Sequence, residues 1–175
     1  MTLLKKGVVV KTAIFYASST GNTSNIAELI GKELSIDSIH DIADVSLSKI
    51  NEYENVIFGI STWGDGDLQD DWDDNFEQLK EVDFSSKKVA LFGLGDQDGY
   101  PDTYLDAMGI VYEQLKSMGA NVVGEWERDE SYEFDDSKAF VDNKFVGLAL
   151  DEDTQDDLTN QRVSKWVSYI KDDFI

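Results

Sequence analysis

One segment of the chain has the residue types of a phosphate-binding loop: Ser18-Ser19-Thr20-Gly21-Asn22-Thr23. It lies between a short apolar run and a stretch whose apolar residues have helical spacing, so we expect it at a helix N-terminus. Such an end presents unpaired N–H groups and a partial positive charge, and the hydroxyl and amide side chains add further donors. The segment has neither a Walker lysine nor a G-x-G-x-x-G pattern. It therefore predicts either a monophosphate held by neutral donors or a plain hydroxyl-rich helix cap.

Two further loops have the residue types that bind a flat ligand. One apolar run is followed by Ser61-Thr62-Trp63-Gly64-Asp65-Gly66-Asp67, and the next by Gly95-Asp96-Gln97-Asp98-Gly99-Tyr100-Pro101. Trp63 and Tyr100 each offer a planar ring for stacking, and the glycines permit close approach of the backbone. The alternatives are a tryptophan folded back over the core and an ordinary turn with a surface tyrosine.

The acidic residues of the chain do not follow a metal-binding pattern. Counted from Asp65, an EF-hand requires glycine at position six and glutamate at position twelve, but the chain has Asp70 and Phe76 there. Counting from Asp151 fails in the same way. The absence of cysteine excludes a thiolate metal site, a disulfide scaffold and a cysteine nucleophile. We therefore expect no metal centre.

Apolar runs of strand length alternate with amphipathic stretches along the chain, which predicts a parallel sheet with helices on both faces. The runs at residues 56–60 and 89–94 are apolar on both parities, as in strands that are covered on both sides. The expected strands are residues 13–17, 39–42, 56–60, 89–94 and 121–125, with a further strand-like run at 145–150.

The expected domain organisation is a single domain over residues 12–175 with an N-terminal appendage at residues 1–11. Lys11 would not fit a buried central strand, so we expect the first strand to begin near Thr12. Residues 127–144 or thereabouts interrupt the strand–helix alternation between two strand-like runs. We therefore expect an insertion that splits or flanks the fifth strand.

Composition and charge limit the classes of partner. The 175 residues carry 36 acidic and 15 basic side chains, for a net charge of −21, and 41% are hydrophobic. That hydrophobic content excludes a disordered acidic tail, and the negative charge disfavours nucleic acid and anionic membranes. No apolar run approaches the roughly 20 residues of a membrane span, and the first residues lack a secretory apolar region. We expect a cytoplasmic monomer that attracts basic proteins.

The acidic residues gather in three clusters, at residues 65–77, 125–136 and 151–157. Charge runs are commonly no more than solvated faces. The first cluster differs because it adjoins Trp63, so we expect it to steer a basic partner toward this edge. The single histidine, His40, lies on the weak second strand, where we expect it to be structural or exposed.

Each of the three loops follows an expected strand, so their positions can be considered together. In a doubly wound sheet of order 2-1-3-4-5, the carboxyl ends of strands one, three and four meet at the switch point where ligands bind. A phosphate cradle then lies beside two aromatic rings. This arrangement predicts a flat heterocycle with a phosphorylated tail.

Four segments in this order resemble the flavodoxin family, specifically its long-chain type. They are SSTGNT at 18–23, the Trp63 loop, ALFGLGDQDGY at 90–100 and FVGLALDEDTQDDLT at 145–159. The resemblance covers about residues 12–175, and the first ten residues and the wording Trp63-Gly64-Asp65-Gly66 depart from the family. It implies a flavodoxin-like doubly wound five-stranded parallel sheet of order 2-1-3-4-5 and FMN as cofactor.

The resemblance also implies which residues contact FMN. The phosphate contacts would come from residues 18–23, and Trp63 and Tyr100 would sandwich the isoalloxazine ring. The Gly64–Asp65 peptide would face flavin N5. Backbone groups at the pyrimidine edge would come from Leu94, Gly95, Asp96 and Gln97. Further contacts near the ring and ribityl chain would come from Thr62, Asp102 and Asp153.

The implied function is that of a low-potential one-electron carrier, not an enzyme, whose FMN shuttles between semiquinone and hydroquinone. Its partners would be redox proteins with basic docking surfaces, such as a flavodoxin or ferredoxin reductase and low-potential oxidoreductases. The acidic residues and two rings around the flavin disfavour the anion formed on full reduction. A Gly64 carbonyl that rotates toward N5 could accept a hydrogen bond from the half-reduced ring.

Two other functions use the same fold. An FMN-dependent quinone reductase would need groups that bind or protonate a substrate, but the three loops contain no histidine or arginine. A phosphoacceptor signalling domain would need an acidic cluster after the first strand, where this chain has Ser18 and Ser19.

Overall fold

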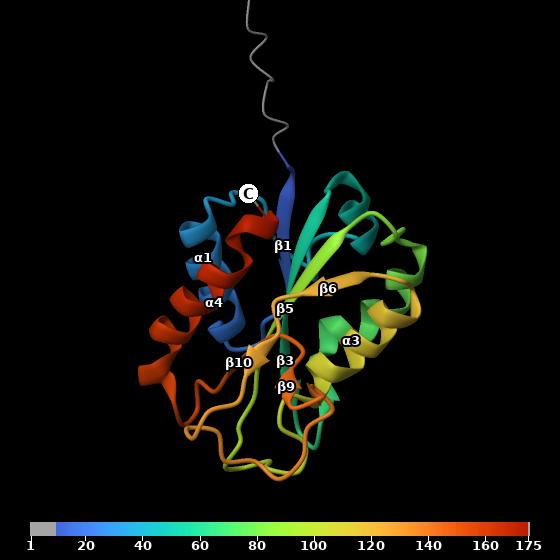
Figure 1. The fold of residues 1–175 in the computed structure, drawn as a ribbon. Helices are drawn as coiled ribbons and strands as arrows, with labels where there is room; N and C mark the ends of the chain where they lie inside the picture. Colours follow the sequence, from blue (N-terminus) through green and yellow to red (C-terminus); the bar gives the residue numbers. More distant parts are fainter. Residues whose placement is uncertain (1–9, 175) are drawn as a thin grey trace, which may run out of the picture.

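The sheet and its covering helices are seen in a computed structural model, which describes residues 10–174 of the chain. The central strands run parallel in the order β10-β5-β3-β1-β2, and β6 also pairs with β5 (Figure 1). The doubly wound parallel sheet expected from the sequence is thus confirmed. The bounds of its strands are β1 Thr12–Tyr16, β2 Ile39–Asp41, β3 Asn55–Trp63, β5 Lys88–Leu94, β6 Asn121–Val123 and β10 Leu148–Leu150.

The fifth strand position is occupied by two short strands instead of one. β6 pairs with Lys88–Ala90 and β10 with Phe92–Leu94, so both lie along the same edge of β5. Residues 124–147 leave the sheet between them, which makes the insertion split the strand. The expected run at 145–150 was too long, because Phe145 belongs to a different sheet and only Leu148–Leu150 pairs with β5.

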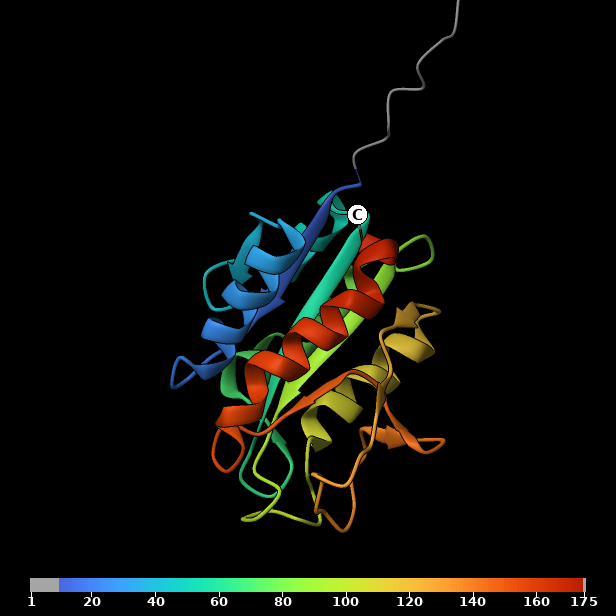
Figure 2. The same cartoon turned by 60° about the vertical axis from the view of Figure 1, so that its left-hand side comes forward.

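Helices cover both faces of the sheet. Figure 1 shows α1 and α4 together on one face and α3 on the other, and Figure 2 shows α4 lying across the front of the strands. The apolar stripe of each long helix faces the sheet, as with Ile26 and Ile30 in α1 and Val163 and Trp166 in α4. The helix bounds are α1 Asn22–Leu34, α2 Asp70–Asn75, α3 Asp106–Ser117 and α4 Thr159–Phe174, with 3-10 turns at η1 Leu47–Glu52, η2 Phe76–Glu81 and η3 Asp156–Leu158.

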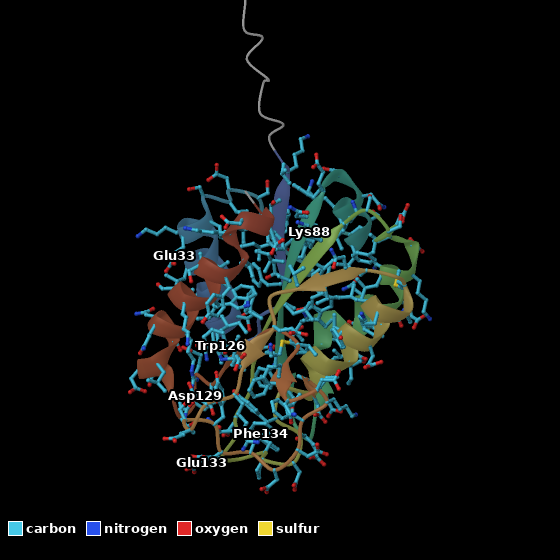
Figure 3. The ribbon with its side chains drawn as sticks, viewed as in Figure 1. Glu33, Lys88, Trp126, Asp129, Glu133 and Phe134 are labelled. Carbon is cyan, nitrogen blue, oxygen red and sulfur yellow. The ribbon has the colours of Figure 1, made fainter. Side chains whose placement is uncertain are left out.

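The insertion has a small core of its own. Its three antiparallel strands, β7 Trp126–Glu127, β9 Lys144–Phe145 and β8 Phe140–Val141, form a second sheet in that order. Phe134 packs on Phe145 with ring centroids 5.4 Å apart, and both lie within 6.1 Å of the Tyr104 ring (Figure 3 labels Trp126 and Phe134). Aromatic packing of this kind stabilises a segment that has few backbone pairs. The insertion is therefore fixed against the main domain.

His40 is a structural residue, as expected. Its ring lies 5.0 Å from the Phe15 ring, and its Nε2 is 3.0 Å from the Tyr53 hydroxyl. Burial lowers the pKa of His40, and nearby Lys49 lowers it further. Phe15 belongs to β1, and Tyr53 directly follows η1.

Candidate functional site

A cavity of about 360 Å³ opens at the carboxyl ends of β1, β3 and β5. Residues from all three loops singled out in the sequence meet there, because these strands are neighbours in the sheet. The lining residues are Ser19, Thr20, Asn22, Thr23, Ser61, Thr62, Trp63, Gly64, Leu94, Gly95, Asp96, Tyr100, Glu152 and Asp153.

One end of the cavity is the N-terminus of α1. Gly21 is the N-cap residue, and within the described chain no side chain makes a capping hydrogen bond to this helix. The Ser18 hydroxyl instead accepts the Gly21 N–H at 3.0 Å, which closes the loop on itself. The hydroxyl-rich cap considered from the sequence is therefore not what forms. The helix N–H groups stay available for an anion.

The other end of the cavity carries two exposed aromatic rings. Trp63 is 41% and Tyr100 46% exposed, and the Trp63 indole N–H donates to the Ser61 hydroxyl at 2.9 Å. The tryptophan is thus not folded back over the core. Exposed large rings on a cavity wall are a common feature of sites for flat ligands.

The loop that carries Trp63 is a tight hairpin. β3 continues to Trp63, and the short strand β4, Asp67–Leu68, pairs back onto Thr62 and Trp63. The Thr62 hydroxyl accepts the Ala107 N–H at 3.1 Å, which ties the base of the hairpin to α3. Its tip is residues 64–66, of which Gly64 lines the cavity.

The loop after β5 holds its own shape through Asp96. The Asp96 carboxylate accepts the N–H groups of Asp98 at 3.1 Å and Gly99 at 2.8 Å, and the Asp96 carbonyl accepts the Tyr100 N–H at 3.0 Å. The Gly95 N–H donates to Leu150 of β10. These bonds fix the position of Tyr100 without any ligand.

Gln97 points away from the cavity. It is 2% exposed, its N–H donates to the Asp151 carboxylate at 3.1 Å, and its side-chain oxygen accepts the Glu133 N–H at 2.7 Å. The backbone donor that the sequence offered to a ligand is thus already bound within the protein. Gln97 joins the loop after β5 to the insertion instead.

The structure brings most of the expected site residues together, but not all of them. Twelve of the seventeen line the cavity, and five do not: Ser18, Gly21, Asp65, Gln97 and Asp102. Ser61 and Glu152 line the cavity and were not expected. Each adjoins an expected residue in the sequence, so taking the whole loop would have found them.

The charged residues on the cavity wall are all acidic. Within the described residues 10–174, no lysine, arginine or histidine lines this cavity, whereas Asp96, Glu152 and Asp153 do. Burial raises the pKa of Asp153, and the neighbouring Asp96 and Asp151 raise it further. Burial likewise raises the pKa of Glu152, even though the Thr159 hydroxyl donates a hydrogen bond to it. The wall therefore disfavours added negative charge near the rings.

Neither a metal site nor a membrane span is found among the described residues. Over residues 10–174, no group of three or more histidine or acidic side chains is placed to hold a metal ion. None of the helices in that same range is long and apolar enough to cross a membrane. The cavity remains the strongest candidate: an uncharged anion cradle at one end and two stacking rings at the other.

Comparisons with known proteins agree on one family. The flavodoxin family model matches residues 14–166. The chain is 50% identical to a flavodoxin of Synechocystis sp. over 164 residues, covering 92% of this chain and 96% of that one. It is 46% identical to flavodoxin 1 of Escherichia coli over 165 residues, covering 93% of both. A crystal structure of Fusobacterium nucleatum flavodoxin bound to flavin mononucleotide superposes with a TM-score of 0.87 at 32% identity, over 94% and 99% of the two chains.

Proposed function

The chain belongs to the flavodoxin family, and on that premise we propose that it binds FMN in the cavity and carries single electrons between redox proteins. It is an electron-transfer protein rather than an enzyme. One observation carries the proposal: the same cavity joins an uncapped helix N-terminus to two exposed rings, Trp63 and Tyr100. FMN has a phosphate at one end and a flat ring at the other, so the two ends of the cavity fit the two ends of the cofactor.

The phosphate end would hold the cofactor without a cation. The donors are the first N–H groups of α1 and the side chains of Ser19, Thr20, Asn22 and Thr23. Ser18 and Gly21 act indirectly here, by shaping the loop through their mutual hydrogen bond. Gln69 supports the loop from the outside, because its side-chain amide donates to the Ser19 hydroxyl at 3.1 Å.

The ring end would bind the isoalloxazine between Trp63 and Tyr100, beside the backbone of Leu94, Gly95 and Asp96. When bound, FMN supplies a centre that accepts and releases single electrons. Gly64 adjoins the ring position, and its peptide to Asp65 is the one that would face flavin N5. Among the other expected contacts, Asp153 lies on the cavity wall, whereas Gln97 and Asp102 would act only from outside it.

The acidic residues of the cavity wall would lower the reduction potential of bound FMN. Asp96, Glu152 and Asp153 line the same cavity as the two rings, and burial raises the pKa of the last two. The same desolvation and negative field oppose the placement of further negative charge on the ring. These residues would therefore oppose the negative charge that bound FMN gains on reduction, as suits a low-potential carrier. The protein tunes the cofactor, and the cofactor supplies the chemistry.

The acidic run at residues 65–77 would be the docking surface for basic redox partners. Most of its carboxylates are exposed, and several belong to α2, whose N-terminus is capped by Gln69. Gln69 also binds Ser19, so the docking helix is tied directly to the phosphate loop. Opposite charge on a partner would speed its encounter with this edge. We place this activity in the cytoplasm, since a cysteine-free acidic chain suits a reducing compartment.

Binding of FMN to the purified apoprotein tests the proposal. We expect one equivalent to bind, with its fluorescence quenched by the two stacked rings, and with riboflavin binding much more weakly because it lacks the phosphate. The loaded protein should exchange electrons with a cationic redox protein but should not sustain turnover of NAD(P)H with a quinone. An apoprotein without affinity for FMN would overturn the proposal, and steady quinone turnover would show an enzyme instead.

A further inference from the structure

We propose that Asp106 couples the insertion, residues 124–147, to the hairpin tip at residues 64–66, so that the insertion controls the conformation of the loop beside the cofactor ring. The relation to FMN rests on the proposed function. The coupling itself is built from contacts within the chain.

Asp106 is a buried carboxylate at the first position of α3. It is 4% exposed, and its Oδ1 accepts the Lys138 N–H from the insertion at 2.7 Å. The Lys138 ammonium lies 3.9 Å from Oδ2, on a side chain that is 63% exposed. The short bond to the backbone is therefore the firm contact, and the ion pair is loose and screened by water.

The backbone of the hairpin tip lies close to the same side chain, on the side of its other oxygen. A Cβ added to Gly66 would lie 3.0 Å from Asp106 Oδ2 and 3.2 Å from Asp106 Cβ, so the glycine backbone packs directly on this side chain. Gly66 has a φ of +96°, which favours glycine. A Cβ on Gly64 would meet only Asp67 Oδ2, at 3.2 Å, which leaves that side of the tip uncrowded. The tip is thus seated at Gly66 and free at Gly64.

The insertion holds its side of the contact rigidly. A Cβ on Gly109, one turn into α3, would collide with the backbone of Lys138, so the two segments touch without intervening side chains. The N–H groups of Asp135 and Asp136 donate to the Pro101 carbonyl at 2.8 and 3.0 Å. Lys138 therefore cannot follow a displaced Asp106 without disturbing the packing of the insertion.

The charge of Asp106 makes its hydrogen bond with the Lys138 N–H sensitive to small displacements. Burial raises the pKa of Asp106, the Lys138 N–H and ammonium oppose that rise, and Asp136 and Asp65 add to it. A carboxylate in this position depends on its backbone donor, because an unpartnered buried charge is costly. If the tip presses on Oδ2, the bond from Lys138 to Oδ1 must adjust. Coupling of this kind is reciprocal, so a change in the insertion must also reach the tip.

Amide hydrogen exchange in the apoprotein tests the coupling without any cofactor. The informative variant is Gly66→Ala, whose new methyl group meets Asp106, and its matched control is Gly64→Ala, a like change at positive φ in the same tip that does not reach Asp106. We expect Gly66→Ala to speed exchange of the Lys138 amide at least tenfold, and Gly64→Ala to change it less than threefold. Amides of the central strand β5 should be unchanged in both.

The effect of Asp106 on both segments is tested with Asp106→Ala, and the control is Asp136→Asn, which removes a neighbouring charge but not the contact. Asp106→Ala should speed amide exchange at Lys138 and at residues 64–66. In the FMN-loaded protein it should also change the equilibrium constant of the first one-electron reduction at least threefold, which is a shift in midpoint potential of about 28 mV at 59 mV per tenfold. If Asp106 served only to stabilise α3, Asp106→Ala would lower the free energy of unfolding and leave amide exchange at residues 64–66 unchanged.

The coupling is wrong if Gly66→Ala leaves Lys138 exchange unchanged, or if both glycine variants raise it equally. It is also wrong if Asp106→Ala loosens the insertion but not the tip. Should Asp106→Ala fail to fold, the glycine pair alone decides. If the protein binds no FMN, the proposed function fails, but the exchange results in the apoprotein still support or overturn the coupling.

Discussion

The two ends of the cavity differ in the chemistry of their side chains. At the α1 end, the proposed anion site is made of N–H groups and neutral side chains, and the first turn of the helix has no acidic residue. The other end carries two aromatic side chains, and the charged residues of the cavity lining are the acids Asp96, Glu152 and Asp153. Among the described residues that line the cavity, neither end has a basic side chain. Because no cation among these residues lies between the two ends, the field of the acidic wall would act on a bound ring without compensation, so the ring end would set the reduction potential as well as part of the affinity.

The strongest way to break this contrast is to weaken the neutral phosphate cradle. Thr20→Val removes a hydroxyl from the cavity wall, and a hydrogen bond to a charged group is worth about 1.5–3 kcal/mol. FMN affinity should fall about tenfold or more, while riboflavin affinity stays nearly the same because riboflavin has no phosphate. Titration of the apoprotein with both ligands measures the difference. Equal losses for the two ligands would place the phosphate elsewhere.

The stacking rings should contribute slightly less each. Trp63→Ala and Tyr100→Ala should each weaken FMN by about 1–3 kcal/mol, by analogy with stacking of nucleobases on aromatic side chains. In contrast to Thr20→Val, each should weaken riboflavin by the same factor, since the ring is common to both ligands. Fluorescence titration at constant pH distinguishes the patterns. Native affinity in both alanine variants would contradict the sandwich.

A kinetic test sharpens the contrast at the outer edge of the ring end. Neutralising Asp67, Asp70 and Asp74 together should slow association with a basic acceptor such as cytochrome c about three- to tenfold at low salt, and the difference should shrink as salt screens the charges. Stopped-flow traces over a salt series measure both quantities. The matched control neutralises Asp156, Asp157 and Asp172, three exposed carboxylates outside the run.

Both triple variants must first show the flavin spectrum and potentials of the parent protein, so that only docking differs. If the two variants slow the reaction equally, net charge is what matters and the docking site is misplaced. If neither does, the acidic run serves solubility.

The smallest effect concerns the stability of the apoprotein. Because burial raises the pKa of Glu152 above its ordinary value of 4.5, the proton that it binds stabilises the folded state fully below that value, and the gain is lost as pH rises through the raised pKa. Glu152→Gln keeps an acceptor for Thr159 and removes the charge. It should raise the free energy of unfolding by less than about 1 kcal/mol at pH 7, since the group is partly screened by solvent, with the difference vanishing near pH 4.

Urea unfolding of the apoprotein at the two pH values measures the effect. Asp157→Asn, at an exposed position, is the control for a general loss of negative charge. A destabilised Glu152→Gln variant at pH 7 would mean that the charge is favourable where it stands.

The sequence predicted the parts of the fold that local patterns determine. Buried strands such as β3 and β5 are apolar on both parities, and the polar segment before α1 indicates a helix start whatever the rest of the chain does. What it could not predict depends on partners distant in sequence. From its position in the loop, Gln97 was expected to contact a ligand. In the structure its backbone N–H donates to Asp151, and its side-chain oxygen accepts the N–H of Glu133 in the insertion. The run at 145–150 could not be divided between two sheets from its composition alone.

The break in the fifth strand makes the insertion an exchangeable cassette. Val123 pairs with Ala90 and Leu148 with Phe92, so only the position of Leu91 separates the two halves along one edge. A single residue that joined Val123 to Leu148 would restore an unbroken strand, but the shortened protein would expose Tyr104, Gly109 and Arg162, which the insertion now covers. The same two junctions match the ends of a foreign segment whose termini lie one residue apart along β5. These two positions on the edge of β5 are therefore suitable for inserting a sensor or a binding segment into an electron-transfer protein.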